Sequence, residues 1–220
     1  MPKESLQQKR KRVRKIIARL KKAYPDARLE LNFSNPLELL IALILAARTR
    51  DELVNAITPG LFRRYRTAAD WANEKPAVLH RLLRSINFYR NKTRAIQKAT
   101  RALMEKFGGQ VPNRLEDLLT LPGVGRKTAN ILLGNAFDQP AIGVDTHVAR
   151  VSQRLGLTDH TDPDEIEADL TQIVPKKDQV KFVHLFQWHG RRICIPQVPD
   201  CPHCPVNDLC PYPKKTKAKM

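Results

Sequence analysis

Two side chains of opposite charge, Lys127 and Asp145, stand at the predicted starts of two helices, where together they could do covalent chemistry. Lys127 follows the turn "LPGVG" and lies in the first turn of a helix that reads "RKTANILLGNAF". The positive end of a helix dipole disfavours an ammonium ion there, which favours the neutral amine, a nucleophile toward electrophilic carbon. A phosphate-binding lysine that keeps its charge fits the local sequence equally well.

Asp145 stands in "AIGVDTHVARV", after an apolar run and directly before a predicted helix that begins at Thr146. An aspartate at this position is predicted to cap the helix by accepting hydrogen bonds from its first N–H groups. A nucleophilic amine also needs a companion that handles protons and positive charge. Capping and this second role are compatible in one carboxylate.

The turn before Lys127 contains Pro122, Gly123 and Gly125. Both glycines can adopt positive φ and allow another backbone to come close. The free N–H groups at the start of the following helix form a site for a phosphate. Taken alone, the same residues also fit an ordinary turn between two packed helices.

The four cysteines, Cys194, Cys201, Cys204 and Cys210, all lie in the last 27 residues. A disulfide framework would spread its crosslinks over the chain, so this clustering predicts metal binding in a reducing compartment. Their spacing alone fits zinc and an iron–sulfur cluster equally well.

The composition favours nucleic acid as the partner. Lys and Arg total 39 against 22 Asp and Glu, a formal net charge of +17, although acidic residues cluster between positions 159 and 169. No apolar run is long enough to span a bilayer, and "MPKESLQQKRKRVRKII" is too charged for a secretory signal peptide, so we expect no membrane association. A basic domain whose charge only solvates it, or an acidic protein bound to the N-terminal helix, are the alternatives.

Helical periodicity predicts an all-α protein. A first helix over 5–22 carries the apolar stripe Leu6, Val13, Ile16, Ile17 and Leu20. Asn35 is predicted to cap a buried helix that begins at Pro36, and Asp162 to cap another with Glu165 completing a capping box. Turn signals such as "TPG" and "FGGQVPN" mark breaks, and the remaining expected helices cover 51–64, 75–85, 90–107 and 115–120. The final residues, 214–220, are predicted to be a disordered basic tail.

Several of these motifs together resemble the endonuclease III family of DNA glycosylases. They are "LPGVGRKTAN", "VDTH" eighteen residues after Lys127, "INFYRNKTRAI", and four cysteines separated by six, two and five residues. The resemblance implies a two-lobed helix-hairpin-helix glycosylase fold. Its six-helix barrel domain would be 29–140, with the hairpin at about 115–137. Its discontinuous cluster domain would be 1–28 with 141–213, and a [4Fe-4S] cluster would be held by Cys194, Cys201, Cys204 and Cys210.

The resemblance also implies a function in base-excision repair. The chain would be a monomeric DNA N-glycosylase and AP lyase that removes oxidised pyrimidines from double-stranded DNA and also acts on abasic sites. Lys127 would be the nucleophile that forms a Schiff base, and Asp145 the catalytic carboxylate. The expected location is the cytoplasm, at the nucleoid. A non-catalytic helix-hairpin-helix DNA-binding protein and a glycosylase for mismatched bases are the alternatives.

Two segments depart from the family pattern. "AARTRD" places Arg48 where a glutamine is common, at the position that fills the gap left by a flipped base. "INFY" places Phe88 where an aliphatic wedge is common and Asn87 where glycine is common, and asparagine tolerates left-handed φ. The alternative is that Arg48 binds a phosphate and Phe88 belongs to the core. The predicted DNA-binding residues are Leu121, Gly123, Val124, Gly125, Arg126, Arg48, Phe88 and His147.

Overall fold

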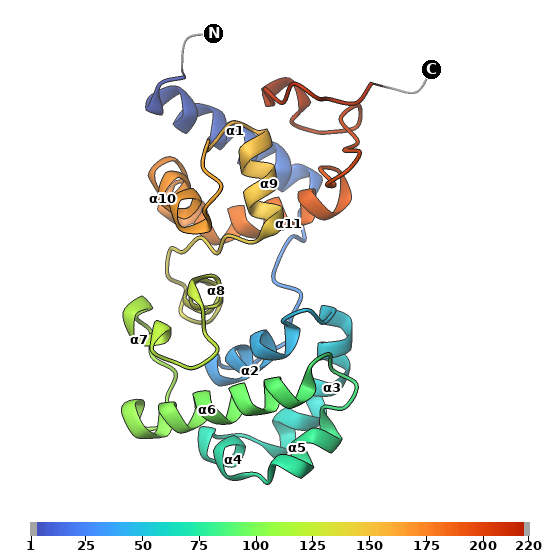
Figure 1. Ribbon diagram of the computed structural model, residues 1–220. Helices are drawn as coiled ribbons and strands as arrows, with labels where there is room; N and C mark the ends of the chain where they lie inside the picture. The colour runs from blue at the N-terminus through green and yellow to red at the C-terminus, as the bar shows by residue number, and fades with distance from the viewer. Residues whose placement is uncertain (1–3, 218–220) are drawn as a thin grey trace. The chain divides into compact units, whose positions relative to one another are not determined.

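The computed structural model describes residues 4–217, and within them the regular elements are eleven α-helices and two short 3-10 helices, with no strand (Figure 1). The all-α prediction is therefore confirmed. None of the helices in this part of the chain is long and apolar enough to cross a membrane.

The chain folds into two compact units. Unit 1 combines the chain up to Leu29 with the chain from Pro140 onward, and unit 2 is Glu30–Gln139. Each unit buries its own set of apolar side chains, and the two units are described separately below.

Unit 2 is built around the buried helix α2. The side chain of Asn35 accepts a hydrogen bond from the N–H of Glu38 and Pro36 occupies the first turn, so the predicted start is confirmed. Helix α2 contacts α3, α6 and α8. The helices of unit 2 are α2 (Pro36–Ala46), α3 (Asp51–Arg64), α4 (Ala68–Asn73), α5 (Pro76–Leu82), α6 (Tyr89–Phe107), α7 (Leu115–Leu119) and α8 (Arg126–Ala136).

Two local features of unit 2 differ from the sequence expectation. The helix expected over 51–64 is found as α3, but the turn signal "TPG" marks no break, because Pro59 lies inside α3, where the neighbouring Thr58 and Leu61 are buried. Helix α4 was not predicted, although Thr67 and Asp70 form a capping box at its start. Only six residues follow this cap, too few to display a helical period.

Unit 1 contains α1 (Leu6–Ala23), α9 (Thr146–Arg154), α10 (Pro163–Ile173), α11 (Gln179–Arg192) and the 3-10 helices Lys176–Asp178 and Asn207–Leu209. The stripe on α1 is buried against this unit's core, except that Leu6, at the end of the helix, is 46% exposed. Phe182 and Phe186 of α11 are fully buried in this core, and their ring centroids are 3.9 Å apart.

Two further expectations in unit 1 need correction. Asp162 caps α10 as predicted, but the carboxylate of Glu165 lies 3.1 Å from Nδ1 of His160 rather than completing a capping box. The predicted disordered tail is ordered at its start, because Lys215 and Thr216 hydrogen-bond to the cysteine segment. Residues 218–220 of that tail lie outside the described part of the chain.

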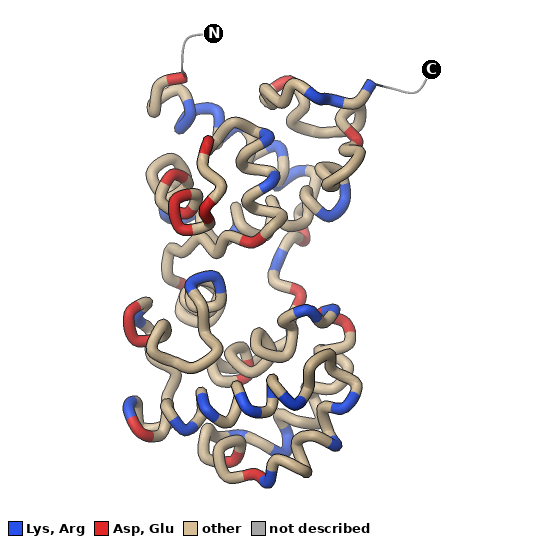
Figure 2. The backbone as a smooth tube through the Cα atoms, in the orientation of Figure 1, with Lys and Arg blue, Asp and Glu red and all other residues tan. Residues whose placement is uncertain are grey.

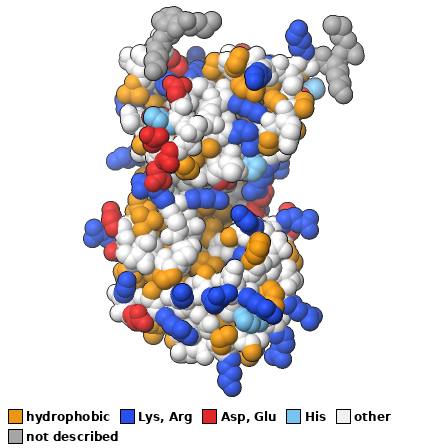
Figure 3. All heavy atoms as spheres, viewed as in Figure 1, with side chains coloured by type: hydrophobic (Ala, Val, Ile, Leu, Met, Phe, Trp, Pro, Cys, Tyr) orange, Lys and Arg blue, Asp and Glu red, His pale blue; other side chains and the backbone are white. Residues whose placement is uncertain are grey.

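Charge is distributed unevenly within both units. Acidic segments gather at α10 in unit 1, whereas Lys and Arg recur along α6 in unit 2 (Figure 2). On the face drawn in Figure 3, basic side chains spread over unit 2 and outnumber the acidic ones. This is the pattern expected of a surface that attracts a polyanion.

Candidate active site and cysteine pocket

The glycine turn between α7 and α8 needs glycine at one position only. Gly123 has φ +84°, and a Cβ added to it would lie 3.4 Å from the Cβ of Ala95. Gly125 has the extended conformation φ −91° and ψ 172°, so the expected positive φ is found at Gly123 alone of the two. Leu121 and Val124 are buried, so their side chains belong to the packing of unit 2.

Gly125 leaves the start of α8 open. It is the N-cap residue and provides no side-chain cap for the first N–H groups of the helix. A Cβ added there would meet no atom within 4 Å, so packing within the protein does not require this glycine. Arg126 is half-buried and Lys127 is exposed, and together they mark the start of α8 as basic (Figure 2). Lys127 lies in the first helical turn, as predicted.

The start of α9 is capped, as predicted, by Asp145. Its Oδ1 accepts hydrogen bonds from the N–H groups of His147 and Val148, at 2.9 and 2.8 Å. Its Oδ2 accepts a third, at 3.0 Å, from Nε2 of Gln187 on α11. Three donors from two helices thus fix the orientation of this half-buried carboxylate.

Close packing of α9 on α11 holds the Gln187 donor in place. A Cβ added to Gly190 would lie 2.9 Å from the Cβ of His147, so the two helices approach too closely for a larger residue. Arg150 reinforces the contact by donating to the carbonyl oxygens of Gly190 and Cys194, at 2.7 and 2.9 Å. Burial lowers the pKa of His147, which favours its neutral imidazole.

Arg48 and Phe88 lie together in unit 2 and both have left-handed backbones, with φ of +55° and +58°. The Arg48 guanidinium carbon is 6.0 Å from the Phe88 ring centroid. Phe88 is 58% exposed, so its assignment to the core is wrong. Asn87 does not take the positive φ expected for it. Its side chain instead donates to the carbonyl oxygen of Arg48 at 2.8 Å.

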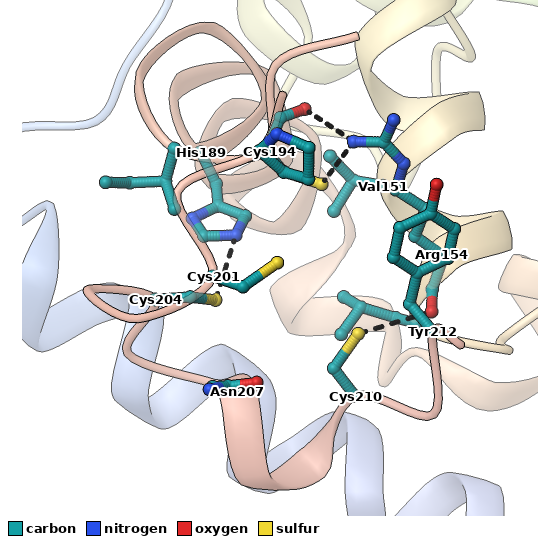
Figure 4. Close-up of a pocket in the computed structure, with 12 residues that line it drawn as sticks. Val151, Arg154, His189, Cys194, Cys201, Cys204, Asn207, Cys210 and Tyr212 are labelled. Atoms are coloured by element: carbon teal, nitrogen blue, oxygen red, sulfur yellow. Dashed lines mark hydrogen bonds between the residues drawn. The ribbon is translucent and has the colours of Figure 1, made fainter. Parts of the chain in front are cut away.

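The four cysteines line one pocket in unit 1, and all four are free thiols. Figure 4 shows their sulfur atoms directed toward a common space, from the end of α11 and the loop that follows it. The pocket has about 370 Å³ of empty space, part of it open to solvent. In the described residues, no three His, Cys, Asp or Glu side chains are grouped closely enough to hold a single metal ion.

Donors from two helices surround the thiols. Arg154 of α9 approaches the sulfur of Cys194 at 3.4 Å and donates to Ile195 O at 2.7 Å. His189 of α11 lies between Tyr24 and Cys204, with Nδ1 3.0 Å from the Tyr24 hydroxyl and Nε2 3.6 Å from the Cys204 sulfur. Burial lowers the pKa of His189 to about 4, so the ring is neutral and can donate one N–H to sulfur.

The pocket is suited to a positively charged inorganic group. Burial raises the pKa of Cys204 to about 11 and also raises that of Cys210, so without such a group these sulfurs stay protonated. The Oδ1 of Asn207, another lining residue, is buried without a hydrogen-bond partner. Four sulfur ligands with N–H donors beside them are the donor set of an iron–sulfur cluster.

Four contributors to these sites were missed in the sequence: Arg150, Arg154, Gln187 and His189. Arg150 and Arg154 are four residues apart on α9 and so lie on one face of the helix, a spacing from which a shared contact could have been predicted. Gln187 and His189 carry no comparable signal, because the packing of α11 decides which side chains meet Asp145 and the thiols.

A glycine turn between two helices, followed by a helix start without a side-chain cap, is the geometry expected of a helix-hairpin-helix motif. A family model described as "HhH-GPD superfamily base excision DNA repair protein" matches residues 41–176. The chain belongs to this superfamily, and it is an enzyme of base excision repair, a DNA glycosylase.

Individual relatives agree with this assignment. Endonuclease III of Synechocystis sp. is 47% identical over 205 residues, 92% of this chain and 93% of that protein. Endonuclease III of Bacillus subtilis is 43% identical over 197 residues, 89% of this chain and 90% of that protein. A solved structure of "a trapped endonuclease III-DNA covalent intermediate" matches with a TM-score of 0.86 at 44% identity, covering 92% of this chain and 96% of that one. The endonuclease III family carries a [4Fe-4S] cluster.

Proposed function

We propose that this glycosylase is also an AP lyase, that it acts on oxidised pyrimidines in duplex DNA, and that Lys127 is its nucleophile. The observation that carries the proposal is the position of Lys127, exposed in the first turn of α8 beside an uncapped helix start. A backbone phosphate bound at this helix start would bring the adjacent sugar to the lysine. The covalent complex solved for a 44% identical endonuclease III supports a covalent route.

The first chemical step is displacement of the base. The lone pair of the neutral Nζ of Lys127 attacks C1′ of the sugar and forms the N–C1′ bond. The C1′–N bond to the base breaks, and its electron pair leaves with the base, which takes up a proton. Opening of the sugar ring then gives a Schiff base between Lys127 and C1′.

The second step is strand cleavage. Loss of a proton from C2′ of the Schiff base allows β-elimination, in which the C3′–O3′ bond breaks and the 3′ phosphate leaves. Water then hydrolyses the C=N bond, which releases an unsaturated aldehyde on the DNA end and regenerates Lys127.

Asp145 is proposed as the carboxylate that stabilises positive charge on the sugar and assists proton transfer. Both of its oxygens already accept hydrogen bonds, which hold the group in one orientation for this task. Because Oδ2 accepts only one of these bonds, it retains a lone pair that can receive a proton.

DNA binding is proposed to combine contacts to the phosphate backbone with side chains that insert into the duplex. Leu121, Gly123, Val124, Gly125 and Arg126 would bind the backbone, the first four through main-chain atoms, with His147 as a further contact. Arg48 and Phe88 would enter the duplex and replace the extruded base. The enzyme would act as a monomer on DNA in the cytoplasm, at the nucleoid.

We propose that Cys194, Cys201, Cys204 and Cys210 hold a [4Fe-4S] cluster. The cluster would supply structural crosslinking rather than catalysis, because it would join the end of α11 to the loop that carries the other cysteines. We expect freshly purified protein to be brown and to contain about four iron atoms per chain. Colourless protein with stoichiometric zinc and no iron would refute this assignment.

Borohydride trapping tests the lyase proposal. The reagent reduces a Schiff base to a stable amine, so wild-type enzyme should crosslink to a duplex with one abasic site. Lys127→Gln should form no crosslink, whereas Lys106→Gln, an exposed lysine on α6, should trap normally. Persistent trapping by Lys127→Gln would show that another amine is the nucleophile. A panel of duplexes with single oxidised pyrimidines or mismatches then identifies the preferred base.

A further inference from the structure

Lys92 is a buried lysine in unit 2 that the proposed chemistry does not use. The residue is only 6% exposed, and burial lowers the pKa of its amine to about 8. Nζ donates to the carbonyl oxygen of Leu45 at 2.6 Å and to the hydroxyl of Thr49 at 2.8 Å. Burying an ammonium beside uncharged partners is costly, so its retention calls for a role.

The two partners of Lys92 lie on either side of Arg48. Leu45 is in the last turn of α2, and Thr49 follows Arg48 directly. Lys92 itself lies in the first turn of α6, the helix whose N-cap residue is Phe88. One buried side chain therefore ties the loop that carries Arg48 to the turn that carries Phe88.

A second tie joins the same two segments at the surface. Asn87 precedes Phe88, and its Nδ2 donates to the carbonyl oxygen of Arg48. With this bond and those of Lys92, three oxygen atoms on residues 45–49 accept hydrogen bonds from Asn87 or Lys92.

The backbone at Arg48 and Phe88 requires such support. Positive φ is unfavourable for both residue types, and for the bulky Phe88 in particular, so each segment alone would relax to another conformation. Strained backbone persists where surrounding contacts fix it. The contacts that do so here come from Lys92 and Asn87.

We propose that Lys92 is a positioning residue that locks Arg48 and Phe88 into a single preformed wedge, which enters the duplex as one unit. This inference rests on the proposed function, since it assumes that these two side chains act at the lesion. Without the lock, the wedge would have to be ordered again for each base that is extruded. The cost would fall on extrusion and not on the chemistry at Lys127.

Two substrates separate extrusion from chemistry. A duplex with a damaged base requires the enzyme to unstack that base, whereas a preformed abasic site presents only a sugar for β-elimination. Lys92→Met keeps the length of the side chain and removes its donors. We expect it to slow single-turnover base excision about 10-fold or more, as for loss of a charge-assisted hydrogen bond, and to slow cleavage at the abasic site less than about 3-fold.

Controls and weaker variants keep this test decisive. Lys106→Met, at an exposed site on the same helix, should match wild type on both substrates. If Lys92→Met does not fold, Thr49→Val and Asn87→Ala each remove one tie and should shift the same ratio in the same direction. Circular dichroism and the iron content establish that each variant is folded.

The outcomes are distinct. A selective loss of base excision in Lys92→Met or in both weaker variants supports the lock. Equal rates with wild type on both substrates, or equal losses on both, overturn it. Wild-type enzyme that neither excises a damaged base nor cleaves an abasic site would contradict the proposed function instead, and the trapping experiment would show this independently.

Discussion

The starts of α8 and α9 differ in whether a side chain caps the first N–H groups of the helix. Both helices begin after an extended residue and a proposed catalytic side chain lies at each start, but Gly125 gives α8 no side-chain cap whereas Asp145 caps α9. Lys127 is exposed on its helix, while Asp145 is held by three hydrogen bonds. The start of α8, without a cap, is suited to bind an anion from a ligand, whereas the start of α9 already binds the carboxylate of Asp145.

This difference suggests a DNA-binding role for the start of α8 in unit 2 and a preoriented catalytic carboxylate in unit 1. In unit 2, the start of α8 has no side-chain cap of its own and is proposed to be completed by a DNA phosphate. In unit 1, the carboxylate is fixed before any substrate arrives, through α11 and through Arg150, which also binds the carbonyl of Cys194. Changes at the two helix starts should therefore affect different measurements.

The largest expected effect is loss of strand cleavage in Lys127→Gln. Removal of the nucleophile should lower the cleavage rate at an abasic site by at least about 1000-fold. Affinity for the same duplex, measured by fluorescence anisotropy, should change by less than about 3-fold, because the glutamine side chain does not cap the N–H groups proposed to bind the phosphate. A parallel loss of affinity would mean that Lys127 only binds phosphate.

Asp145→Asn should lower base excision by about 100-fold, since the amide cannot carry negative charge or accept the proton. Asparagine is as good an N-cap as aspartate, so only the hydrogen bond from Gln187 is lost and the melting temperature should fall less than in Asp145→Ala. Asp145→Ala adds the loss of the cap and should destabilise the protein by about 1 kcal/mol. If Asp145→Asn excises bases at the wild-type rate, the carboxylate is only a cap.

Gly125→Asp would convert the open helix start into a closed one. The extended backbone and the open space around Gly125 accept this side chain, which should cap α8 and raise the free energy of unfolding by a few tenths of a kcal/mol. Its charge should weaken DNA binding by about 10-fold or more through repulsion of the phosphate. Gly125→Ser, a neutral cap, is the matched control. Unchanged affinity in Gly125→Asp would show that no phosphate binds there.

The smallest expected effect on function comes from His184, which should change only how the stability of the protein depends on pH. Burial lowers the pKa of His184 on α11 from 6.5 to about 4, so the unfolded chain binds a proton that the folded chain excludes. Stability from this residue is complete above pH 6.5 and is lost as the pH falls toward 4, by about 1.4 kcal/mol per pH unit at most. Thermal melts from pH 7 to 4.5 should show a smaller slope for His184→Gln. An unchanged slope would assign the acid sensitivity to other groups.

The sequence predicted the features that local rules control. Asn35, Asp145 and Asp162 cap their helices because a short polar side chain before an apolar period satisfies the free N–H groups. The apolar stripe of α1 was also predictable, since a 3.6-residue period directs Val13, Ile16, Ile17 and Leu20 to one side.

Features that depend on tertiary contact were not predictable. A lysine is normally exposed, and only the fold brings Leu45 and Thr49 to Lys92. The left-handed backbone was expected at Asn87 on local preference but occurs at Arg48 and Phe88, where contacts between two segments override that preference. Gln187 meets Asp145 only because Gly190 allows α9 and α11 to pack closely.

The central claim is that the amine of Lys127 attacks the sugar. The most direct test is to trap wild-type enzyme on abasic-site DNA with borohydride, digest protein and DNA, and locate the remnant by peptide mass spectrometry. We predict a single modified peptide, with the sugar remnant on Lys127. A remnant on another lysine or on the N-terminal amine, with Lys127 unmodified, would contradict the account.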